Sequence, residues 1–418
     1  MVITLFIMNI IATITIVCFE KHMQKTLLTP FIVLAVPYMF SIIGAMTLDK
    51  LGYLANHVIV EGMLINFIFL IAFFLSQFPV YIAFDKRVLL KKLRFRSRKL
   101  HLSLIFYILS IVIAIYLSIK FIQLINYIEL YPVLKKKILA YGIRGHLSNI
   151  SIPLISYLIY NYVKEKNIWK LLLIIFFAFV VFVYKLTIGT KYLLFSFLLT
   201  MVYSYVTFNE KKISLKTILV IFISILVGFS ATYAVSFSFN NNSFNAWRYD
   251  FLSFVLRHIS NYMFSPAYNS GIIFYNNITN TNGNVVLLAN LYNMYILISS
   301  SISSSTLQYK TGIVPIFITF MEGEESNVFG MFADIFFKTG SYFLTFISTF
   351  LISIFSYWVF YMSKFTKNTH LRILNIINLS FLSISFFSFW YGQLTMLEAM
   401  LIPISLYITT TIIKGGLK

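Results

Sequence analysis

Long, continuous runs of apolar residues recur along the whole chain, and short segments between them hold most of its charge. Many of these runs approach or exceed the roughly 20 residues that a helix needs to cross a hydrocarbon core. A transmembrane β-barrel would instead need apolar and polar residues in alternation, a pattern that these runs lack. We expect about eleven membrane-spanning helices, over 2–19, 27–46, 62–83, 102–124, 150–163, 171–186, 191–208, 217–235, 341–361, 373–389 and 396–412.

The composition leads to the same fold class. Of the 418 residues, 59% are hydrophobic and only 11% are charged, which is too little polar surface to cover a soluble globule. The sequence therefore predicts an all-α polytopic membrane protein, with residues 1–418 forming a single integral membrane domain. One large loop, residues 236–340, is inserted between the eighth and ninth helices. The first apolar run has no basic region before it and no cleavage site after it, so it is expected to be a retained helix.

The net charge of +20 could suggest a nucleic-acid partner, but the placement of the charge indicates membrane topology instead. If Glu20–Thr26 is cytoplasmic, alternation of the helices puts the strongly basic segment 84–101 on the same side. The segments on that side hold 21 of the 33 Lys and Arg residues. The positive-inside rule then places the N-terminus and the 236–340 loop outside and the C-terminus in the cytoplasm. No nucleic-acid partner is expected, and 84–101 is interpreted as a topology anchor at the lipid headgroups.

The large outer loop is the first place to look for chemistry, because loops of that length are usually functional. Its segment NAWRYDFLSFVLRHISNYMF has helical apolar spacing and predicts an interfacial amphipathic helix. Arg248 and Arg257 lie nine residues apart and point to opposite faces of that helix. His258 is a candidate base near neutral pH, although a structural or interfacial histidine is the more common case.

Basic residues on the outer side oppose the topology rule and need another reason. The predicted outer loop 125–149 contains Arg144 and His146 beside three lysines, and the TIGTK turn ends in Lys191. Arginine presents a planar donor fork that suits phosphate or pyrophosphate oxygens. Contact with lipid phosphates is an equally good explanation for the loop, and snorkelling of Lys185 and Lys191 is the alternative for the turn.

Aromatic and amide side chains in the large loop could bind sugars, although an interfacial aromatic belt would have the same composition. The set includes Trp247, Tyr249, Tyr262, Tyr268, Tyr275, Tyr292, Tyr295, Asn261 and Asn269. The chain has a single cysteine, Cys18, and no GxxxxGK[ST] or HExxH motif. We therefore expect no metal and no cofactor.

Three stretches of the chain resemble the Wzy-type oligosaccharide repeat unit polymerases, which build O-antigen and capsular polysaccharide. They are TIGTKYLLFSFLL, HISNYMFSPAYNSGIIFYNN and SNVFGMFADIFFKTGSYFLTF, and the third is the most specific. The third stretch is similar to the family's entry from an NVY start to a DFG step, and here it begins at Asn327. The position that resembles the Asp of that step is Lys338, so an acidic role there would pass to Asp334.

The resemblance implies a GT-C-like glycosyltransferase in the bacterial inner membrane. Such an enzyme transfers a growing glycan from undecaprenyl pyrophosphate to another lipid-linked repeat unit, at the periplasmic face and without metal. Implied partners are the undecaprenyl-pyrophosphate-linked oligosaccharide, membrane lipids and a chain-length regulator protein. We predict His258 and Arg257 as catalytic residues, with His146 and the run Glu322, Glu324 and Glu325 as alternative bases. The predicted substrate-binding residues are Arg144, Lys191, Arg248, Tyr262, Tyr268 and Asn327.

Two other functions stay open. An O-antigen ligase has the same architecture and the same donor. A transporter or flippase of lipid-linked sugars would have short loops and charged residues inside its helices. Glu61, Glu398 and His57 lie near helix ends, so the sequence keeps a proton-coupled pathway open.

Overall fold

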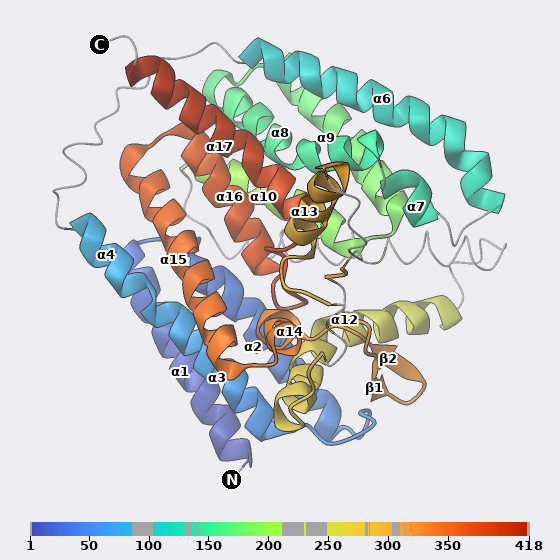
Figure 1. Cartoon of the computed structure of the whole chain (residues 1–418), viewed down its shortest axis with the longest axis vertical. Helices are drawn as coiled ribbons and strands as arrows, with labels where there is room; N and C mark the ends of the chain where they lie inside the picture. The colour runs from blue at the N-terminus through green and yellow to red at the C-terminus, as the bar shows by residue number, and fades with distance from the viewer. Residues whose placement is uncertain are drawn as a thin grey trace. The chain divides into compact units, whose positions relative to one another are not determined.

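A computed structural model of the chain describes residues 2–85, 103–130, 135–140, 142–210, 230, 249–280, 283, 285–302, 310–312 and 314–415. Arg248, Trp247 and nearly all of the predicted helix 217–235 lie outside these residues. The chain divides into two compact units (Figure 1). Unit 1 comprises Met1–Lys91, Arg257–Tyr361 and Phe381–Leu397, and unit 2 comprises Lys92–Leu256, Met362–Ser380 and Glu398–Lys418.

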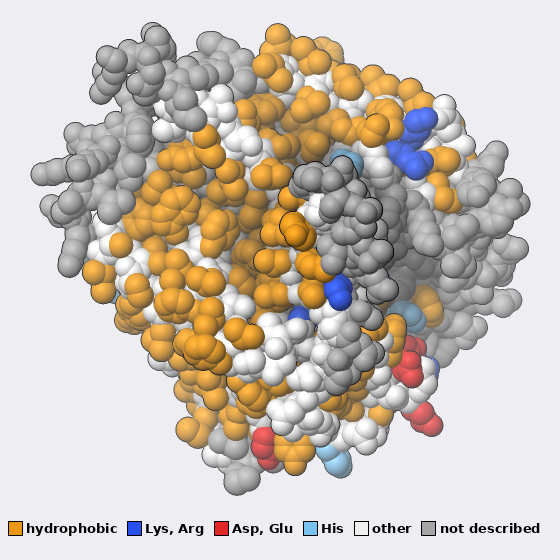
Figure 2. Space-filling model, viewed as in Figure 1, with side chains coloured by type: hydrophobic (Ala, Val, Ile, Leu, Met, Phe, Trp, Pro, Cys, Tyr) orange, Lys and Arg blue, Asp and Glu red, His pale blue; other side chains and the backbone are white. Residues whose placement is uncertain are grey.

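Within the described residues, eight helices are long and apolar enough to cross a membrane. Large hydrophobic side chains are exposed along these helices, as on Ile11, Phe179 and Phe343, and hydrophobic atoms cover much of the surface in Figure 2. Such exposure is expected where lipid is the solvent. The prediction of an all-α multi-pass membrane protein is confirmed. The candidate spans are Phe6–Gln24, Pro30–Lys50, Val60–Phe84, Leu104–Ile125, Ile168–Ile188, Lys191–Phe208, Tyr342–Thr366 and Leu394–Thr411.

Unit 1 is built around helices that run side by side in Figure 1. Thr29 caps α2 by accepting a hydrogen bond from the Ile32 N–H, and Pro30 occupies the first helical position, where its missing N–H costs nothing. The helices that lie wholly or partly in unit 1 are α1 (Val2–Gln24), α2 (Pro30–Lys50), α3 (Val60–Leu75), α4 (Gln77–Asp85), α12 (Tyr249–Tyr275), α13 (Ala289–Ile302), α14 (Gly330–Thr339) and α15 (Tyr342–Thr366).

The second half of α12 is buried between α2 and α3. The Ser41 hydroxyl accepts a hydrogen bond from the Ala267 N–H at 3.3 Å. Two glycines allow α3 and α12 to touch, because a Cβ built on Gly62 would lie 2.1 Å from the Gly271 carbonyl oxygen. The expected interfacial character therefore fits only the first half of this helix, where Leu256 and Arg257 are exposed.

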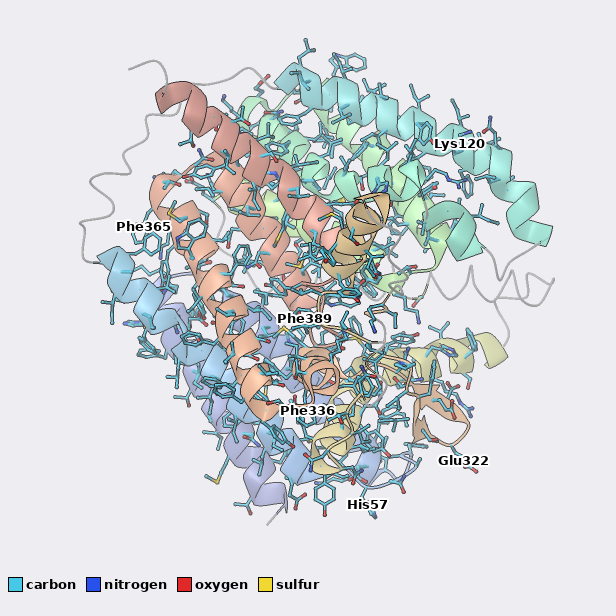
Figure 3. All side chains as sticks on the ribbon, in the orientation of Figure 1. His57, Lys120, Glu322, Phe336, Phe365 and Phe389 are labelled. Atoms are coloured by element: carbon cyan, nitrogen blue, oxygen red, sulfur yellow. The ribbon has the colours of Figure 1, made fainter. Side chains whose placement is uncertain are left out.

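Two predicted outer loops meet at one end of unit 1. The strands β1 (Ile318–Met321) and β2 (Glu324–Ser326) form an antiparallel hairpin inside the large loop. The Ala55 N–H, in the loop between α2 and α3, donates to the Phe320 carbonyl at 3.0 Å. His57 and Glu322 consequently lie at the same end of the unit (Figure 3). Alternation of the helices had put both loops on one side of the membrane.

Unit 2 is a bundle in which α8 packs against α6, α9 and α10. Its interior contains hydroxyl pairs, such as the Ser204 hydroxyl donating to Ser156 at 2.8 Å and the Thr200 hydroxyl donating to Ser380 at 3.0 Å. Its helices are α6 (Ser103–Leu130), α7 (Lys135–Ala140), α8 (Ile143–Glu165), α9 (Ile168–Ile188), α10 (Lys191–Phe208), α16 (Thr369–Ser383) and α17 (Leu394–Gly415), the last two of which also extend into unit 1.

The predicted helix 373–389 is wrong over 384–389, because α16 ends at Ser383. The residues that follow turn back on themselves and bind the start of α14. The Gly330 N–H donates to the Phe387 carbonyl at 3.0 Å, and the Met331 N–H donates to the Ser385 carbonyl at 2.8 Å. An apolar run of this length cannot by itself distinguish a continuing helix from a buried turn whose backbone bonds another element.

Candidate functional site

The clearest catalytic geometry in unit 2 joins α8 to the start of α17. Nδ1 of His146 lies 2.5 Å from Oε1 of Glu398, and the Asn149 side-chain amide donates to Oε2 at 2.7 Å. His146 and Asn149 are three residues apart, so one face of α8 contacts both oxygens of the carboxylate. The Glu398 side chain is 16% exposed and that of His146 is 53% exposed. A carboxylate that bonds Nδ1 fixes the ring and leaves Nε2 to act as a base.

A buried lysine lies on the neighbouring helix α9. The Lys185 side chain is fully buried, and its Nζ donates to the Ser148 carbonyl at 2.8 Å and to the Ser148 hydroxyl at 3.1 Å. The Phe197 ring centroid lies 5.9 Å from the same nitrogen. No described carboxylate lies within ion-pair distance of Lys185. Since an unpaired charge in a membrane interior is costly, such a residue is a candidate for binding an anion.

Two of the predicted substrate-binding residues belong to this end of unit 2. Arg144, in the first turn of α8, is half-buried and close enough to the Tyr184 hydroxyl to interact electrostatically with it. Tyr184 precedes Lys185 and donates to the Leu139 carbonyl at 2.9 Å. Lys191 is half-buried and begins α10, directly after the turn in which Gly189 ends α9 with φ +73°. Helix N-termini carry partial positive charge and therefore add to the attraction for anions. We call Arg144, Lys185 and Lys191 the basic cluster.

A second polar centre lies in unit 1, where α14 carries a buried ion pair. Lys338 Nζ lies 2.7 Å from Oδ1 of Asp334, and the two side chains are 1% and 2% exposed. Oδ2 of Asp334 accepts a hydrogen bond from the Ser388 hydroxyl and another from the Phe389 N–H at 2.8 Å. The Phe389 ring, labelled in Figure 3, faces Lys338 Nζ at 5.6 Å. All of these bonds hold α14 against the segment after α16, so the pair has a structural role in the contacts described.

The predicted catalytic residues of the large loop lie on α12. Arg257 is exposed and His258 is half-buried. The Tyr262 ring meets Phe387 edge-on at 6.4 Å, and burial raises the pKa of its hydroxyl, with a further contribution from Glu324. Tyr268 is fully buried and packs against Phe320 in a hydrophobic cluster. Tyr268 thus has no exposed surface in this structure with which to contact a sugar.

The asparagines of α12 hold the backbone of the large loop. The Asn269 amide donates to the Val328 carbonyl at 2.9 Å and to the Ser326 carbonyl at 3.3 Å. The Asn261 amide donates to the Glu325 carbonyl at 3.1 Å. Asn327, a predicted substrate-binding residue, is half-buried and lies between two backbone groups that Asn269 fixes. The spacing of eight residues between Asn261 and Asn269 places them on one helix face, which could have indicated this role.

The predicted site residues therefore fall into two sets, one in each unit. Arg144 and Lys191 share the end of unit 2 that also contains His146, whereas Arg257, His258, Tyr262, Tyr268 and Asn327 belong to unit 1. Sequence reasoning missed Lys185, Asn149 and the pairing of Glu398 with His146. A lysine within an apolar run was a signal for the first, but no local pattern connects His146 to a residue 252 positions away.

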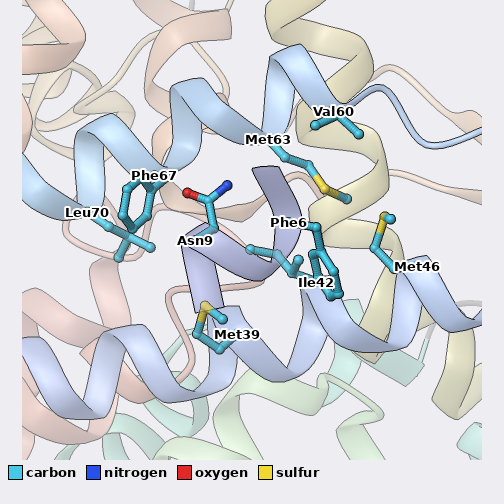
Figure 4. A pocket seen from close by; sticks show the side chains of 9 residues that line it. All are labelled: Phe6, Asn9, Met39, Ile42, Met46, Val60, Met63, Phe67 and Leu70. Atoms are coloured by element: carbon cyan, nitrogen blue, oxygen red, sulfur yellow. The ribbon is translucent and has the colours of Figure 1, made fainter. Parts of the chain in front are cut away.

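A small apolar cavity lies between α1, α2 and α3 of unit 1 (Figure 4). Asn9 is the single polar residue among those that line it, and the lining includes no titratable side chain. The cavity therefore contributes no acid–base or nucleophilic group. Its lining residues are Phe6, Asn9, Met39, Ile42, Met46, Val60, Met63, Phe67 and Leu70.

Comparison with known proteins gives a family without an assigned activity. Residues 53–414 match the family model described as "Family of unknown function (DUF6337)". No curated protein and no solved structure matches the chain.

Proposed function

The chain belongs to DUF6337, a family of unknown function, and we propose from its own residues that it is a metal-independent glycosyltransferase acting on lipid-linked oligosaccharides. In this proposal it joins repeat units carried on undecaprenyl pyrophosphate, at the periplasmic face of a bacterial inner membrane. The product is O-antigen or capsular polysaccharide. The observation that carries the proposal is the buried Lys185, which has no ion-pair partner among the described carboxylates, beside the Glu398–His146 pair.

The basic cluster suits the donor in this reaction. A glycosyl pyrophosphate is already activated, so the enzyme has to neutralise the leaving pyrophosphate and orient the acceptor hydroxyl. Among the described residues, Ser148 alone supplies hydrogen-bond acceptors to Lys185, and Arg144 forms no ion pair with a described carboxylate. Arg144 can therefore turn its guanidinium to a phosphate without breaking an ion pair, whereas the fully buried Lys185 would act through the field of its charge rather than by direct contact.

His146 is the base that this geometry favours. Its Nε2 takes the proton from the acceptor hydroxyl while the acceptor oxygen bonds to the anomeric carbon of the donor. The bond between that carbon and the pyrophosphate oxygen breaks, and the lipid pyrophosphate leaves with the bonding electrons. Glu398 stabilises the imidazolium that forms, as a carboxylate does for other catalytic histidines. The sequence had ranked His258 first, and the carboxylate bound to His146 is the reason for the change in the proposal.

The test uses the purified full-length protein in lipid vesicles with lipid-pyrophosphate-linked repeat units, and the products are resolved by size. Wild-type protein should form a ladder of elongated glycans. His146→Ala should lower the rate by about 10²- to 10⁴-fold, as expected for loss of a general base. Lys185→Met should lower it by roughly 10²- to 10³-fold, through lost electrostatic stabilisation.

Lys170→Met is the matched control. Lys170 lies on the same helix as Lys185, but it forms an ion pair with the exposed Glu165. This variant should leave the ladder unchanged. Elongation that persists in both His146→Ala and Lys185→Met would refute the site. Transfer only to a lipid A core acceptor, without elongation, would identify a ligase instead.

Transport of lipid-linked saccharides is the second candidate function, and one observation favours it. The ionisable side chains Glu20 and Lys185 are fully buried within candidate membrane spans, which is a feature expected of transporters. The same vesicles distinguish the two functions. A transporter would move labelled lipid-linked repeat units between leaflets without changing their size.

A further inference from the structure

A buried polar cluster joins α1 to α15 in unit 1. Glu20 is fully buried, and its Oε1 accepts a hydrogen bond from the Tyr357 hydroxyl at 2.6 Å. One turn along both helices, the Gln24 amide donates to the Tyr361 hydroxyl at 2.6 Å. All four residues belong to candidate membrane spans. The carboxyl group of Glu20 is thus enclosed by protein within the apolar part of the molecule.

Within the described residues, no positive charge compensates Glu20. No described basic side chain lies within ion-pair distance, and Lys21 and His22 on α1, Lys25 just after it and Lys364 on α15 are all exposed. The groups that face the cluster from the packed helices are neutral side chains: Thr29 from the start of α2, Tyr81 from α4, and Tyr357 and Tyr361 from α15. A bare carboxylate in such surroundings is costly, and a buried acid usually relieves that cost by taking up a proton.

Two buried polar groups of unit 1 have unmet hydrogen-bonding capacity. Oε2 of Glu20 has no hydrogen-bond partner among the described residues, and neither has the oxygen or the nitrogen of the fully buried Gln77 amide. Gln77 lies four residues after Phe73, whose ring is 6.1 Å from that of Tyr357. It also lies four residues before Tyr81, whose ring is 6.0 Å from that of Tyr361. α3 ends at Leu75 and α4 begins at Gln77, but the two form one candidate span that continues through Ser76, so this spacing directs Gln77 toward the face that carries these rings.

We propose that Glu20, Gln77 and Tyr357 form a proton-binding site within the membrane-spanning part of unit 1. When Glu20 holds the proton on Oε2, its O–H donates to the Gln77 amide oxygen. When the proton leaves, Gln77 presents its amide N–H to the carboxylate instead. An amide has both an acceptor and donors, so it satisfies either state of the acid. The Tyr357 hydroxyl donates to Oε1 in both states.

This site is independent of the proposed sugar transfer, because none of its residues belongs to the basic cluster or to the Glu398–His146 pair. It gives the protein a group whose charge follows proton uptake within the membrane. The ligand is the proton itself, and bound Na⁺ or K⁺ is the competing possibility that the experiment has to separate.

The test labels the full-length protein in lipid nanodiscs with a hydrophobic carbodiimide, which reacts with protonated carboxyl groups. Peptide mass spectrometry then measures modification of Glu20 from acidic to alkaline pH. We expect labelling that is lost as the pH rises, and no labelling of this peptide in Glu20→Gln. Infrared spectra of the wild-type protein should show a protonated carboxyl band that disappears over the same pH range.

Two tyrosine variants provide the matched comparison. Tyr357→Phe removes the hydroxyl that bonds the carboxylate, so labelling should persist to a pH about one to two units higher. Tyr361→Phe removes an equivalent hydroxyl one turn away and should leave the midpoint unchanged. Labelling that is insensitive to pH, or equal shifts in the two variants, would overturn the proposal. So would protection by Na⁺ or K⁺ at constant pH, which would assign the site to a metal cation.

Discussion

The buried ion pair of α14 gives a quantitative test of how the large loop is anchored. Lys338→Met removes the only described positive charge within ion-pair distance of Asp334, although the Ser388 hydroxyl and the Phe389 N–H still bond the carboxylate. Both side chains are at most 2% exposed, so water cannot replace the lost partner. Removing one member of a buried pair costs about 3–5 kcal/mol, because the other charge is left uncompensated.

The double variant Asp334→Asn with Lys338→Met removes the whole ion pair. It therefore distinguishes the effect of losing the pair from the effect of leaving one buried charge uncompensated. The new amide oxygen can still accept from the Phe389 N–H, and no charge remains buried. Replacing a whole buried pair by neutral groups is often close to neutral in stability. The double variant should therefore be more stable than Lys338→Met alone, a non-additivity typical of directly coupled residues.

The assay is thermal unfolding of the purified protein in lipid nanodiscs, with the four members of the double-mutant cycle measured together. Lys338→Met should lower the apparent Tm by roughly 5–15 °C, and the double variant should recover most of that loss. Lys170→Met, which breaks the more exposed pair with Glu165, should leave the apparent Tm close to that of wild type. A Lys338→Met variant as stable as wild type, or a double variant whose losses simply add, would refute the reasoning.

Two further predictions concern the packing of α12 in unit 1, and the same unfolding assay measures both. Gly62→Ala should destabilise the protein by about 1–3 kcal/mol, because the new Cβ would lie 2.1 Å from the Gly271 carbonyl oxygen. Gly312→Ala, whose nearest neighbour would be 3.4 Å away, is its control, and equal stability of the two variants would contradict the close helix contact. Asn269→Ala should also cost about 1–3 kcal/mol, because the Ser326 and Val328 carbonyls lose a donor. Asn280→Ala loses one local bond to the Val285 carbonyl and should cost less, and the reverse order would remove Asn269 from its anchoring role.

The charge pattern and the structure agree on which segments lie together, within the limits of each unit. Alternation of the helices had put the α2–α3 loop and the large loop on one side, and the Ala55–Phe320 hydrogen bond joins these two loops. It had also put Arg144, Lys191 and the start of the last helix on that side, and His146 bonds Glu398 there. Successive membrane spans run in opposite directions, so the side of the membrane on which each loop lies can be predicted from the order of the spans along the sequence.

The candidate site residues could be predicted from the sequence only in part. Arg144 and Lys191 could be selected because basic residues opposed the expected charge bias. Tyr268 was selected as one of the loop aromatics that could stack on a sugar, and it is fully buried, because α12 inserts between α2 and α3 rather than lying along a surface. Asn261 and Asn269 could be recognised as hydrogen-bonding groups, but the choice of partner, sugar or backbone, depended on which element packed opposite them.

The sequence by itself determined the class of the protein and the position of most helices. Burial of apolar groups in lipid is roughly additive along a run of residues, so it can be read from neighbours in the chain. Tertiary structure decided the end of α16 at Ser383, because α14 takes the backbone bonds of the following residues. It also decided the pairing of His146 with Glu398 and of Glu20 with Tyr357, which are 252 and 337 positions apart. Contacts between residues so far apart in the sequence depend on how the helices pack, and the local pattern of apolar and polar residues does not specify that packing.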